Sequence, residues 1–237
     1  MSAPDRPGGR PVAIVHGLVP AAGRGERFGG GEPKQFSLVA GRPLLAWTLE
    51  RLLAAGAASL TVAVPADQLD RARSLVADER VLFVAGGDSR QASVRLCLAA
   101  CPADPDELVL VHDGARPAVA PRDVRACVEA AAGADGAVLG RPVSDTLKLV
   151  AGGAIEATVD RSFLFRAETP QVFSRELLER ALDEAAAAGF VGTDEAAAVE
   201  RLAGVRLVAV TASRPNPKLT AASDLPLVAA LLRDSIG

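Results

Sequence analysis

The stretch Ala21-Ala22-Gly23-Arg24-Gly25-Glu26-Arg27-Phe28-Gly29-Gly30-Gly31-Glu32-Pro33-Lys34-Gln35 decides how this chain is interpreted. It follows an apolar run from Val12 to Val19, which is typical of a buried strand. Its five glycines let backbone amides approach a ligand closely, while Arg24, Arg27 and Lys34 add positive charge. Amides and cations at the carboxyl end of a first strand favour a polyanion such as a nucleoside triphosphate.

Two common phosphate-binding loops do not match this stretch. The dinucleotide fingerprint G-x-G-x-x-G needs a glycine where Phe28 stands and opens directly into a helix, whereas Pro33 intervenes here. A Walker loop needs Ser or Thr after its lysine, but Gln35 follows Lys34. The mismatch argues against an NAD-dependent oxidoreductase, and a flexible glycine-rich surface loop remains the alternative to a phosphate site.

Composition narrows the classes of function. The chain has 237 residues, 49% of them hydrophobic, so it has ample length for a core. A net charge of −3, no Tyr and the single Trp47 argue against nucleic-acid binding. No apolar run is long enough to span a membrane, and residues 1–11 lack the apolar core of a signal peptide. We expect a cytoplasmic protein with a mobile tail at 1–11 and a single domain at 12–237.

Cys97, Cys101 and Cys127 are an odd number of cysteines without C-x-x-C spacing. We interpret them as buried core thiols rather than as metal ligands or disulfide partners.

Strand and helix patterns alternate along the chain, which predicts an α/β fold. We expect a Rossmann-like, mostly parallel twisted sheet with helices on both faces. The polar turns after the first, third and fourth strands should therefore meet in one crevice. After Val12–Val19, strands are expected at Leu60–Val64, Val81–Val84, Leu108–His112, Gly136–Gly140 and Val205–Val210. Helices are expected from Pro43 to Gly56, at Gln68–Ala77 and Ser93–Ala100, from Pro121, and at Ser174–Ala187, Asp194–Leu202 (N-cap Thr193) and Ser223–Ser235.

Residues 145–150 and 154–159 break this rhythm. With the turn Ala151-Gly152-Gly153 between them, they predict a protruding β-hairpin, within an arm at about 142–162. A two-stranded ribbon is marginal alone, so it either folds over its own domain or embraces another subunit. We favour the second arrangement, a homodimer.

A second group of polar residues follows the fourth strand, in Val111-His112-Asp113-Gly114-Ala115-Arg116-Pro117. Asp113 can ligate Mg²⁺ directly or through water, and Arg116 can grip a substrate phosphate bidentately. His112 is tempting as a base, but a phosphate nucleophile is already ionised, so we interpret His112 as structural, and His16 likewise.

The motif A-A-G-x-G-x-R followed by P-K-Q resembles nucleotidyltransferases. Further motifs are the G-G-D-S-R-x-x-S turn at 86–93, Asp113, Asp145-Thr146-x-Lys148, Thr158-Val-Asp-Arg161, Thr169-Pro-Gln171, Thr193-Asp-Glu195 and Lys218-Leu-Thr220. Together with the first motif, they make the chain resemble the 2-C-methyl-D-erythritol 4-phosphate cytidylyltransferases of the non-mevalonate isoprenoid route. These matches cover Val12 to Leu225.

The resemblance implies a reaction and its residues. CTP and 2-C-methyl-D-erythritol 4-phosphate would give the CDP-polyol and pyrophosphate, with Mg²⁺ and a homodimer whose arm acts on the neighbouring site. Implied catalytic residues are Arg27, Lys34, Arg161 and Lys218. Implied nucleotide contacts are Ala21, Ala22, Gly23, Gly25, Gly86, Gly87, Asp88, Ser93 and Gly114. Implied substrate contacts are Asp113, Arg116, Thr146, Thr169 and Thr193, with Asp113 also at the metal.

One departure and two alternatives remain at this stage. Pro217 precedes Lys218 where the family usually has another residue, and it removes a backbone donor and stiffens the turn. A ribitol-phosphate cytidylyltransferase of the same family would share the loops and the dimer. A non-catalytic nucleotide sensor would often lose catalytic cations, which are present here.

Overall fold

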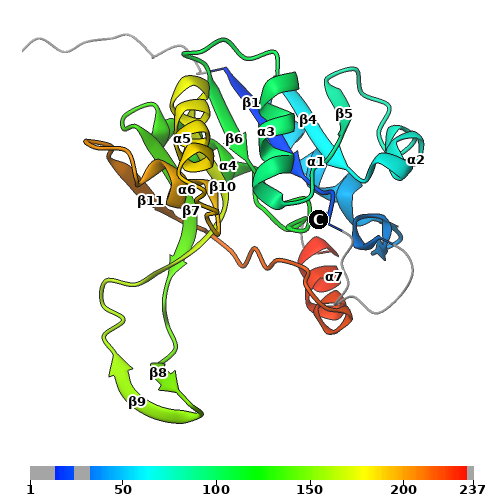
Figure 1. Cartoon of the computed structure of the whole chain (residues 1–237). Helices are drawn as coiled ribbons and strands as arrows, with labels where there is room; N and C mark the ends of the chain where they lie inside the picture. Colours follow the sequence, from blue (N-terminus) through cyan, green and yellow to red (C-terminus); the bar gives the residue numbers. More distant parts are fainter. Residues whose placement is uncertain (1–13, 24–32, 234–237) are drawn as a thin grey trace, which may run out of the picture.

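A seven-stranded sheet with helices on both sides forms the centre of the protein in the computed structural model, which describes residues 14–23 and 33–233 (Figure 1). The strand order is β11-β7-β10-β6-β1-β4-β5. β10 runs antiparallel to its neighbours β6 and β7, whereas the pairings β1–β4, β1–β6, β4–β5 and β7–β11 are parallel. The predicted Rossmann-like, mostly parallel sheet is therefore confirmed.

The strands of the central sheet are β1 (Val15–Pro20), β4 (Ser59–Val64), β5 (Val81–Ala85), β6 (Leu108–Val111), β7 (Gly136–Pro142), β10 (Phe165–Ser174) and β11 (Leu207–Thr211). Two antiparallel pairs lie outside it: β2 (Leu38–Val39) with β3 (Arg42–Pro43), and β8 (Leu147–Ala151) with β9 (Ala154–Val159).

The α-helices are α1 (Leu44–Ala54), α2 (Leu69–Arg73), α3 (Arg90–Ala100), α4 (Pro121–Ala131), α5 (Arg175–Ala187), α6 (Glu195–Val199) and α7 (Leu225–Arg233). Short 3₁₀ helices are η2 (Lys34–Phe36), η3 (Ala66–Gln68) and η4 (Ala222–Asp224). Within the described ranges no helix has the length and apolar character needed to cross a membrane.

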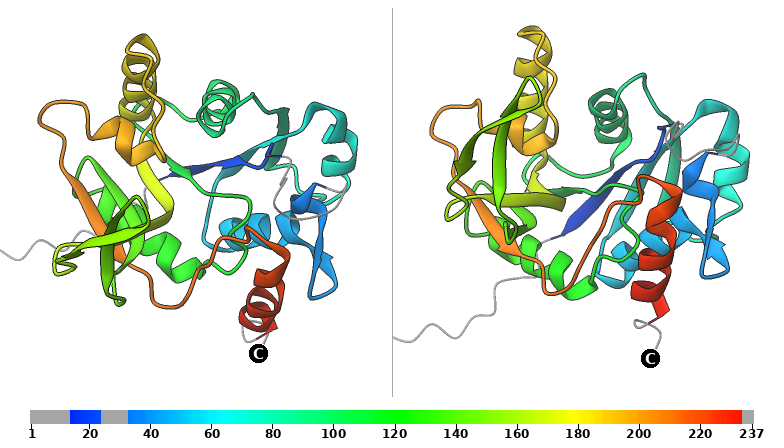
Figure 2. Two further views of the ribbon diagram at one scale, coloured as in Figure 1. Left: turned by 60° about the horizontal axis from the view of Figure 1, so that its bottom comes forward. Right: turned by 90° about the horizontal axis from the view of Figure 1, so that it is seen from below.

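Alternation along the strands divides the core into two layers. Neighbouring strand residues point to opposite faces, so Leu110 packs with α1 and α4, while Val109 and Val111 pack with α3 and α5. Figure 2 shows α3 and α5 on one side of the sheet and α1, α4 and α7 on the other. The buried thiols of Cys97, Cys101 and Cys127 confirm the prediction that these cysteines belong to the core.

The order of the strands creates a switch point beside β1. From β1 the chain moves outward through β4 to β5, then returns to form β6 on the other side of β1. The connections that follow β1 and β6 therefore lead in opposite directions, which opens a crevice at the carboxyl ends of these strands.

The hairpin β8–β9 projects away from the central sheet (Figure 1). Every residue of both strands is exposed, including Leu149 at 55% and Ile155 at 68%. Gly152 and Gly153 form its turn with φ of 57° and 85°, a backbone conformation that favours glycine. The predicted protruding hairpin is confirmed as a feature of the fold.

Several local predictions were wrong or incomplete. The strand β10 was missed, because its sequence, FRAETPQVFS, alternates between apolar and polar residues only in its first half and contains a proline. The predicted helix 68–77 contains only one short α-helix, α2. Asp194, not Thr193, is the N-cap of α6, since its carboxylate accepts the hydrogen bond from the Ala197 amide. The predicted tail 1–11 lies outside the described residues.

Candidate active site

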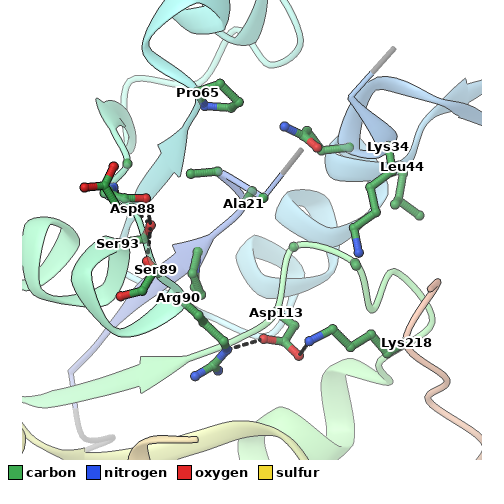
Figure 3. A pocket seen from close by; sticks show the side chains of 18 of the residues that line it. Ala21, Lys34, Leu44, Pro65, Asp88, Ser89, Arg90, Ser93, Asp113 and Lys218 are labelled. Carbon is green, nitrogen blue, oxygen red and sulfur yellow. Dashed lines mark hydrogen bonds and ion pairs between the residues drawn. The ribbon is translucent and has the colours of Figure 1, made fainter. Parts of the chain in front are cut away.

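A crevice of about 1020 Å³ opens where β1, β4, β5 and β6 end (Figure 3). The prediction that the turns after the first, third and fourth strands converge is thereby confirmed. The crevice brings together eleven of the predicted site residues: Ala21, Ala22, Gly23, Lys34, Gly86, Gly87, Asp88, Ser93, Asp113, Gly114 and Lys218. Figure 3 shows Asp88, Ser89 and Ser93 on one side of it, with Lys34, Asp113 and Lys218 on the other.

The turn after β5 forms one wall. Gly86 lies so close to the turn after β1 that a Cβ there would come within 2.1 Å of the Ala22 Cβ, so only glycine permits this approach. The buried Ser93 hydroxyl donates to the Ser89 carbonyl at 2.9 Å and accepts from the Gly87 amide at 3.2 Å. Ser89 in turn caps α3 by accepting from the Ala92 amide. These contacts give the turn a fixed shape.

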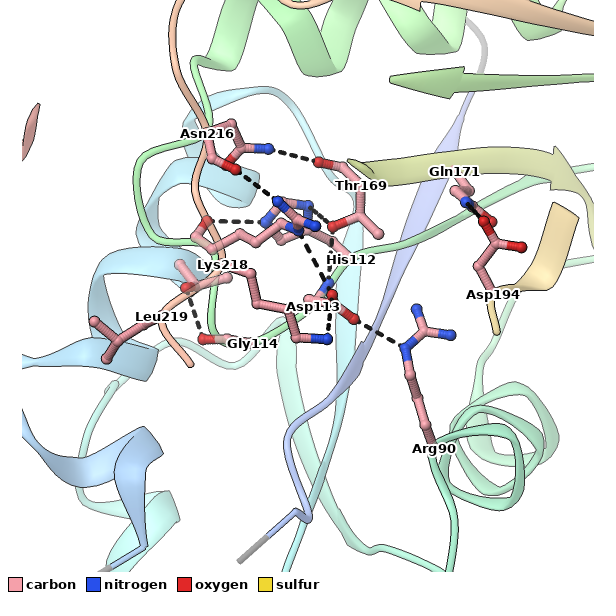
Figure 4. A network of polar contacts seen from close by, with 12 residues as sticks. Arg90, His112, Asp113, Gly114, Thr169, Gln171, Asp194, Asn216, Lys218 and Leu219 are labelled. Atoms are coloured by element: carbon pink, nitrogen blue, oxygen red, sulfur yellow. Dashed lines mark hydrogen bonds and ion pairs between the residues drawn. The ribbon is translucent and has the colours of Figure 1, made fainter. Parts of the chain in front are cut away.

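Asp113 stands at the centre of a cluster of charges (Figure 4). Its Oδ1 accepts from Arg90 Nε at 2.9 Å. Its Oδ2 lies 2.9 Å from Lys218 Nζ and 3.5 Å from Arg116 Nε. Burial alone would raise the pKa of this carboxyl, but the charges of Arg90 and Lys218 outweigh it and hold the pKa well below its usual range. Asp113 is therefore a carboxylate at neutral pH.

His112 connects the Asp113 turn to β10. The imidazole is fully buried, and its Nε2 lies 3.1 Å from the Arg116 carbonyl, which can only accept. Nε2 therefore carries the proton, and Nδ1 accepts from the Thr169 hydroxyl at 3.1 Å. That hydroxyl also accepts from the Asp113 amide. This chain of hydrogen bonds agrees with the structural role expected for His112.

The segment before α7 carries Lys218 into the crevice despite Pro217. Asn216 is buried, donates to the Thr169 carbonyl at 2.9 Å and accepts from Arg116 Nη1 at 2.7 Å. The Leu219 amide donates to the Ala115 carbonyl, and the Leu219 carbonyl accepts from Lys34 Nζ at 3.2 Å. Both flanks of Pro217 are thus anchored to the Asp113 turn, and Lys34 and Lys218 lie close together.

The other predicted site residues lie elsewhere. Arg27 and Gly25 fall outside the described residues. Thr146 and Arg161 are exposed at the base of the hairpin, where Arg161 donates to the Ser144 carbonyl. Thr193 is exposed just before α6. Arg116 and Thr169 contact the Asp113 turn from behind, as described above.

Sequence reasoning missed Arg90, Glu195 and Asn216. Arg90 lines the crevice, and Glu195 and Asn216 are each only 2% exposed. Arg90 stands in the motif at 86–93 and Glu195 in Thr193-Asp-Glu195. The sequence signal that could have found them is a charged residue directly beside a turn predicted to bind a ligand. Among residues 14–23 and 33–233, no cluster of three or more His, Cys, Asp or Glu side chains is placed to hold a metal ion.

Comparison with known proteins gives one consistent answer. Residues 15–234 match the family model described as 2-C-methyl-D-erythritol 4-phosphate cytidylyltransferase. A relative with that name from Acidobacterium capsulatum is 42% identical over 230 residues, covering 91% of this chain and 96% of the relative. A relative with the same name from Halorhodospira halophila is 45% identical over 227 residues, covering 91% of this chain and 92% of the relative.

The fold agrees with this. The crystal structure of 2-C-methyl-D-erythritol 4-phosphate cytidylyltransferase from Thermus thermophilus superposes with a TM-score of 0.77 at 36% identity, covering 93% of this chain and 99% of that one.

The buried imidazole of His112 predicts a pH dependence of stability. Desolvation lowers the pKa of His112 from 6.5 to about 4. Between these pH values the unfolded chain holds a proton that the folded protein does not, so the free energy of unfolding falls as the pH falls. The part due to His112 is about 3 kcal/mol. Denaturant unfolding from pH 7 to pH 4 should show a shallower decline for His112→Asn than for the parent protein. Parallel curves would contradict the assignment.

Proposed function

Because the chain belongs to the 2-C-methyl-D-erythritol 4-phosphate cytidylyltransferase family, it transfers a cytidylyl group from CTP to 2-C-methyl-D-erythritol 4-phosphate, and we propose that the crevice beyond β1, β5 and β6 is where this happens. The observation that carries the proposal is that Lys34 and Lys218, from segments far apart in sequence, line the same crevice as the glycine-containing turns. Backbone amides and cations together suit a triphosphate.

For this reaction the protein has to position the two substrates and stabilise negative charge, and it needs no general base. An oxygen of the polyol phosphate attacks the α-phosphorus of CTP, the bond from that phosphorus to the bridging oxygen breaks, and pyrophosphate leaves. The nucleophile is already ionised, so no proton has to be removed, and the buried, neutral His112 stays outside the reaction. A cation about 4 Å from a phosphate oxygen contributes on the order of 4 kcal/mol at an effective dielectric of ~20. In this proposal Arg27, Lys34 and Lys218 supply that charge.

Different turns around the crevice bind different parts of the nucleotide in this proposal. Ala21, Ala22, Gly23 and Gly25 hold the triphosphate, as the resemblance implies. Gly86, Gly87, Asp88, Ser93 and Gly114 hold the rest of the nucleotide. The hydrogen bonds of Ser93 support this assignment, because they keep the turn after β5 in one conformation before any ligand binds.

We also propose that Mg²⁺ assists the reaction and that Asp113 is its protein partner. A magnesium ion bound chiefly by phosphate oxygens and water needs only one or two carboxylates, and Asp113 is an ionised carboxylate lining the crevice. Both of its oxygens already bind cationic side chains, so contact through water preserves those ion pairs. The ion would neutralise charge on the triphosphate.

The polyol phosphate is assigned to the side of the crevice near α6 and β10. Asp113 lines the crevice here, with Thr169 and Arg116 in contact with it from behind, and Thr193 is exposed just before α6. Thr146 and Arg161 lie at the base of the hairpin, where they serve the neighbouring subunit in this proposal. The exposed apolar residues of the arm support a homodimer, since Leu149, Ile155 and the 93%-exposed Phe163 bury little surface within their own chain.

The two alternatives are less well supported. The relatives of this chain carry the methylerythritol name, which favours that polyol phosphate over ribitol phosphate. A non-catalytic sensor has no reason to place Lys218 on Asp113 and Lys34 on the neighbouring Leu219 carbonyl. We place the enzyme in the cytoplasm, because its three free, buried thiols fit a reducing compartment.

Replacing Lys34 tests the assignment of catalytic charge. Lys34→Ala should lower kcat by about 10²- to 10³-fold, because one preorganised charge that stabilises the transition state is lost. Its Tm should change little, since this lysine supports no core. Arg42→Ala is the matched control: this arginine follows Lys34 closely in the sequence, pairs with Glu50 at 2.8 Å and is 47% exposed. Pyrophosphate release by the Lys34 variant at more than about half the parental rate would exclude Lys34 from the mechanism.

Nucleotide and metal dependence test the ligand assignments. With methylerythritol phosphate, CTP should exceed ATP by about 10²-fold or more in kcat/KM, because a site that hydrogen-bonds one base leaves polar groups unpaired with another. Excess EDTA should abolish activity, and added Mg²⁺ should restore it. Equal turnover of the two nucleotides, or full activity in EDTA, would contradict the assignments, and turnover of ribitol phosphate would measure the alternative directly.

Hybrid dimers test the crossed arm. When Arg161→Ala and Lys34→Ala proteins exchange subunits, one site of each hybrid should carry both lesions and the other neither, so part of the activity should return. If Arg161 instead serves its own chain, each site keeps one lesion and activity stays low. Exchange without recovery, or a monomer in sedimentation, would rule out the crossed arrangement.

A further inference from the structure

The guanidinium of Arg90 lies between two buried carboxylates that come from distant parts of the chain. Its Nε donates to Asp113 Oδ1 at 2.9 Å, and its Nη1 donates to Glu195 Oε1 at 2.6 Å. The two acids are far apart in sequence, and their side chains are 9% and 2% exposed. One arginine thus joins the turn after β6 to the first turn of α6.

The backbone that carries Glu195 is fixed to the central sheet. Gln171 of β10 accepts from the Ala196 amide at 2.9 Å and donates to Asp194 at 2.8 Å, which anchors the start of α6 to the sheet. Desolvation raises the pKa of Glu195, and the charge of Arg90 opposes that shift. Since Glu195 does not line the crevice, its contact with Arg90 is the route by which it acts on the site.

The contact between Arg90 and Asp113 determines how the carboxylate is oriented. Oδ1 is taken by Arg90, so Oδ2 faces Lys218 at 2.9 Å and Arg116 at 3.5 Å. Without Arg90, the carboxylate keeps its contacts through Oδ2 alone, so its rotation about the Cβ–Cγ bond is less restricted. Lys218 then loses the fixed anion that holds its ammonium group in the crevice. Removing one partner of a buried pair also leaves an uncompensated charge.

We propose that Arg90 and Glu195 are positioning residues for cytidylyl transfer, Glu195 holding Arg90 and Arg90 orienting Asp113 and, through it, Lys218. The inference rests on the proposed location of the reaction in this crevice. It distinguishes the pair from residues that bind the nucleotide directly. Misplacement of reacting groups by about 1 Å costs on the order of 10²-fold in rate, so a pair that touches no reacting atom has a measurable effect on turnover.

Four variants separate positioning from direct binding. Arg90→Ala should lower kcat by about 10²-fold, and Glu195→Gln, which keeps the shape of the side chain, by about tenfold. The kcat of Arg90→Lys should lie between those of Arg90→Ala and the parent protein, since a lysine keeps the charge but cannot contact both acids as a fork. The double variant Arg90→Ala/Glu195→Gln should lose no more than Arg90→Ala alone, because Glu195 acts only through Arg90. The dissociation constant of CTP, measured by calorimetry without the polyol phosphate, should change less than about threefold in all four, because neither Arg90 nor Glu195 is among its proposed contacts and misplacement of Lys218 acts on the charge that develops in the transition state.

Arg95→Ala is the matched control. Arg95 lies on the same helix and pairs with Asp183 of α5 at 2.7 Å, but both side chains are exposed and outside the crevice. It should retain the parental kinetics. Millimolar guanidinium chloride, far below denaturing concentrations, should partly restore the turnover of Arg90→Ala, and sodium chloride of equal ionic strength should not. A loss of stability by itself is not repaired by guanidinium.

Three other results would contradict the positioning role, and each identifies a different cause. Weaker CTP binding by Arg90→Ala with no effect of Glu195→Gln would make Arg90 a direct ligand of the nucleotide. Unchanged kcat in a folded Arg90→Ala or Glu195→Gln protein, or additive losses in the double variant, would show that the pair does not position Asp113. An undiminished rate of pyrophosphate release by Lys34→Ala would instead contradict the proposed location of the reaction, and its absence in the parent protein would contradict the function itself.

Discussion

The ionised carboxylate of Asp113, held between Arg90 and Lys218, is the interaction on which the rest of the site depends. A buried carboxylate is costly unless its charge is compensated, and here cations approach it from α3, from the segment before α7 and from its own turn. The same contacts bring three separate parts of the chain to one point. The same contacts therefore compensate the charge of Asp113 and hold the walls of the crevice together.

The sheet topology explains why those parts can meet. The reversal of strand order beside β1 places the ends of β1, β5 and β6 at one edge, with α3 on one face of the sheet and α1 and α4 on the other. The antiparallel strand β10 then brings Thr169 and Gln171 to the same edge from the other direction. Thr169 supports the Asp113 turn through His112, and Gln171 fixes the start of α6. The scaffold is thus rigid on the side where the second substrate is assigned.

Apolar residues are buried in the core but exposed in the hairpin. In the core, strand residues such as Leu110 are completely buried between helices. In the hairpin β8–β9, Leu149 and Ile155 stay exposed, and the ribbon projects from the body (Figure 1). The chain therefore contains a folded site and a separate element whose apolar surface suits a second copy of the chain.

The sequence by itself determined the α/β class, the parallel part of the sheet, the protruding hairpin and most residues of the crevice. The class, the sheet and the hairpin depend on local signals such as apolar periodicity and glycine turns, whereas most of the crevice residues, Lys218 among them, were named through the resemblance to the family. Only the tertiary structure decided that β10 lies between β6 and β7, that Asp194 caps α6, and that Arg90 joins Asp113 to Glu195. A contact between residues 90 and 195 leaves no periodic trace in either segment. The partner of a buried charge is therefore set by how the layers pack, and sequence reasoning named Asp113 and Lys218 without finding that they pair or that Arg90 holds the same carboxylate.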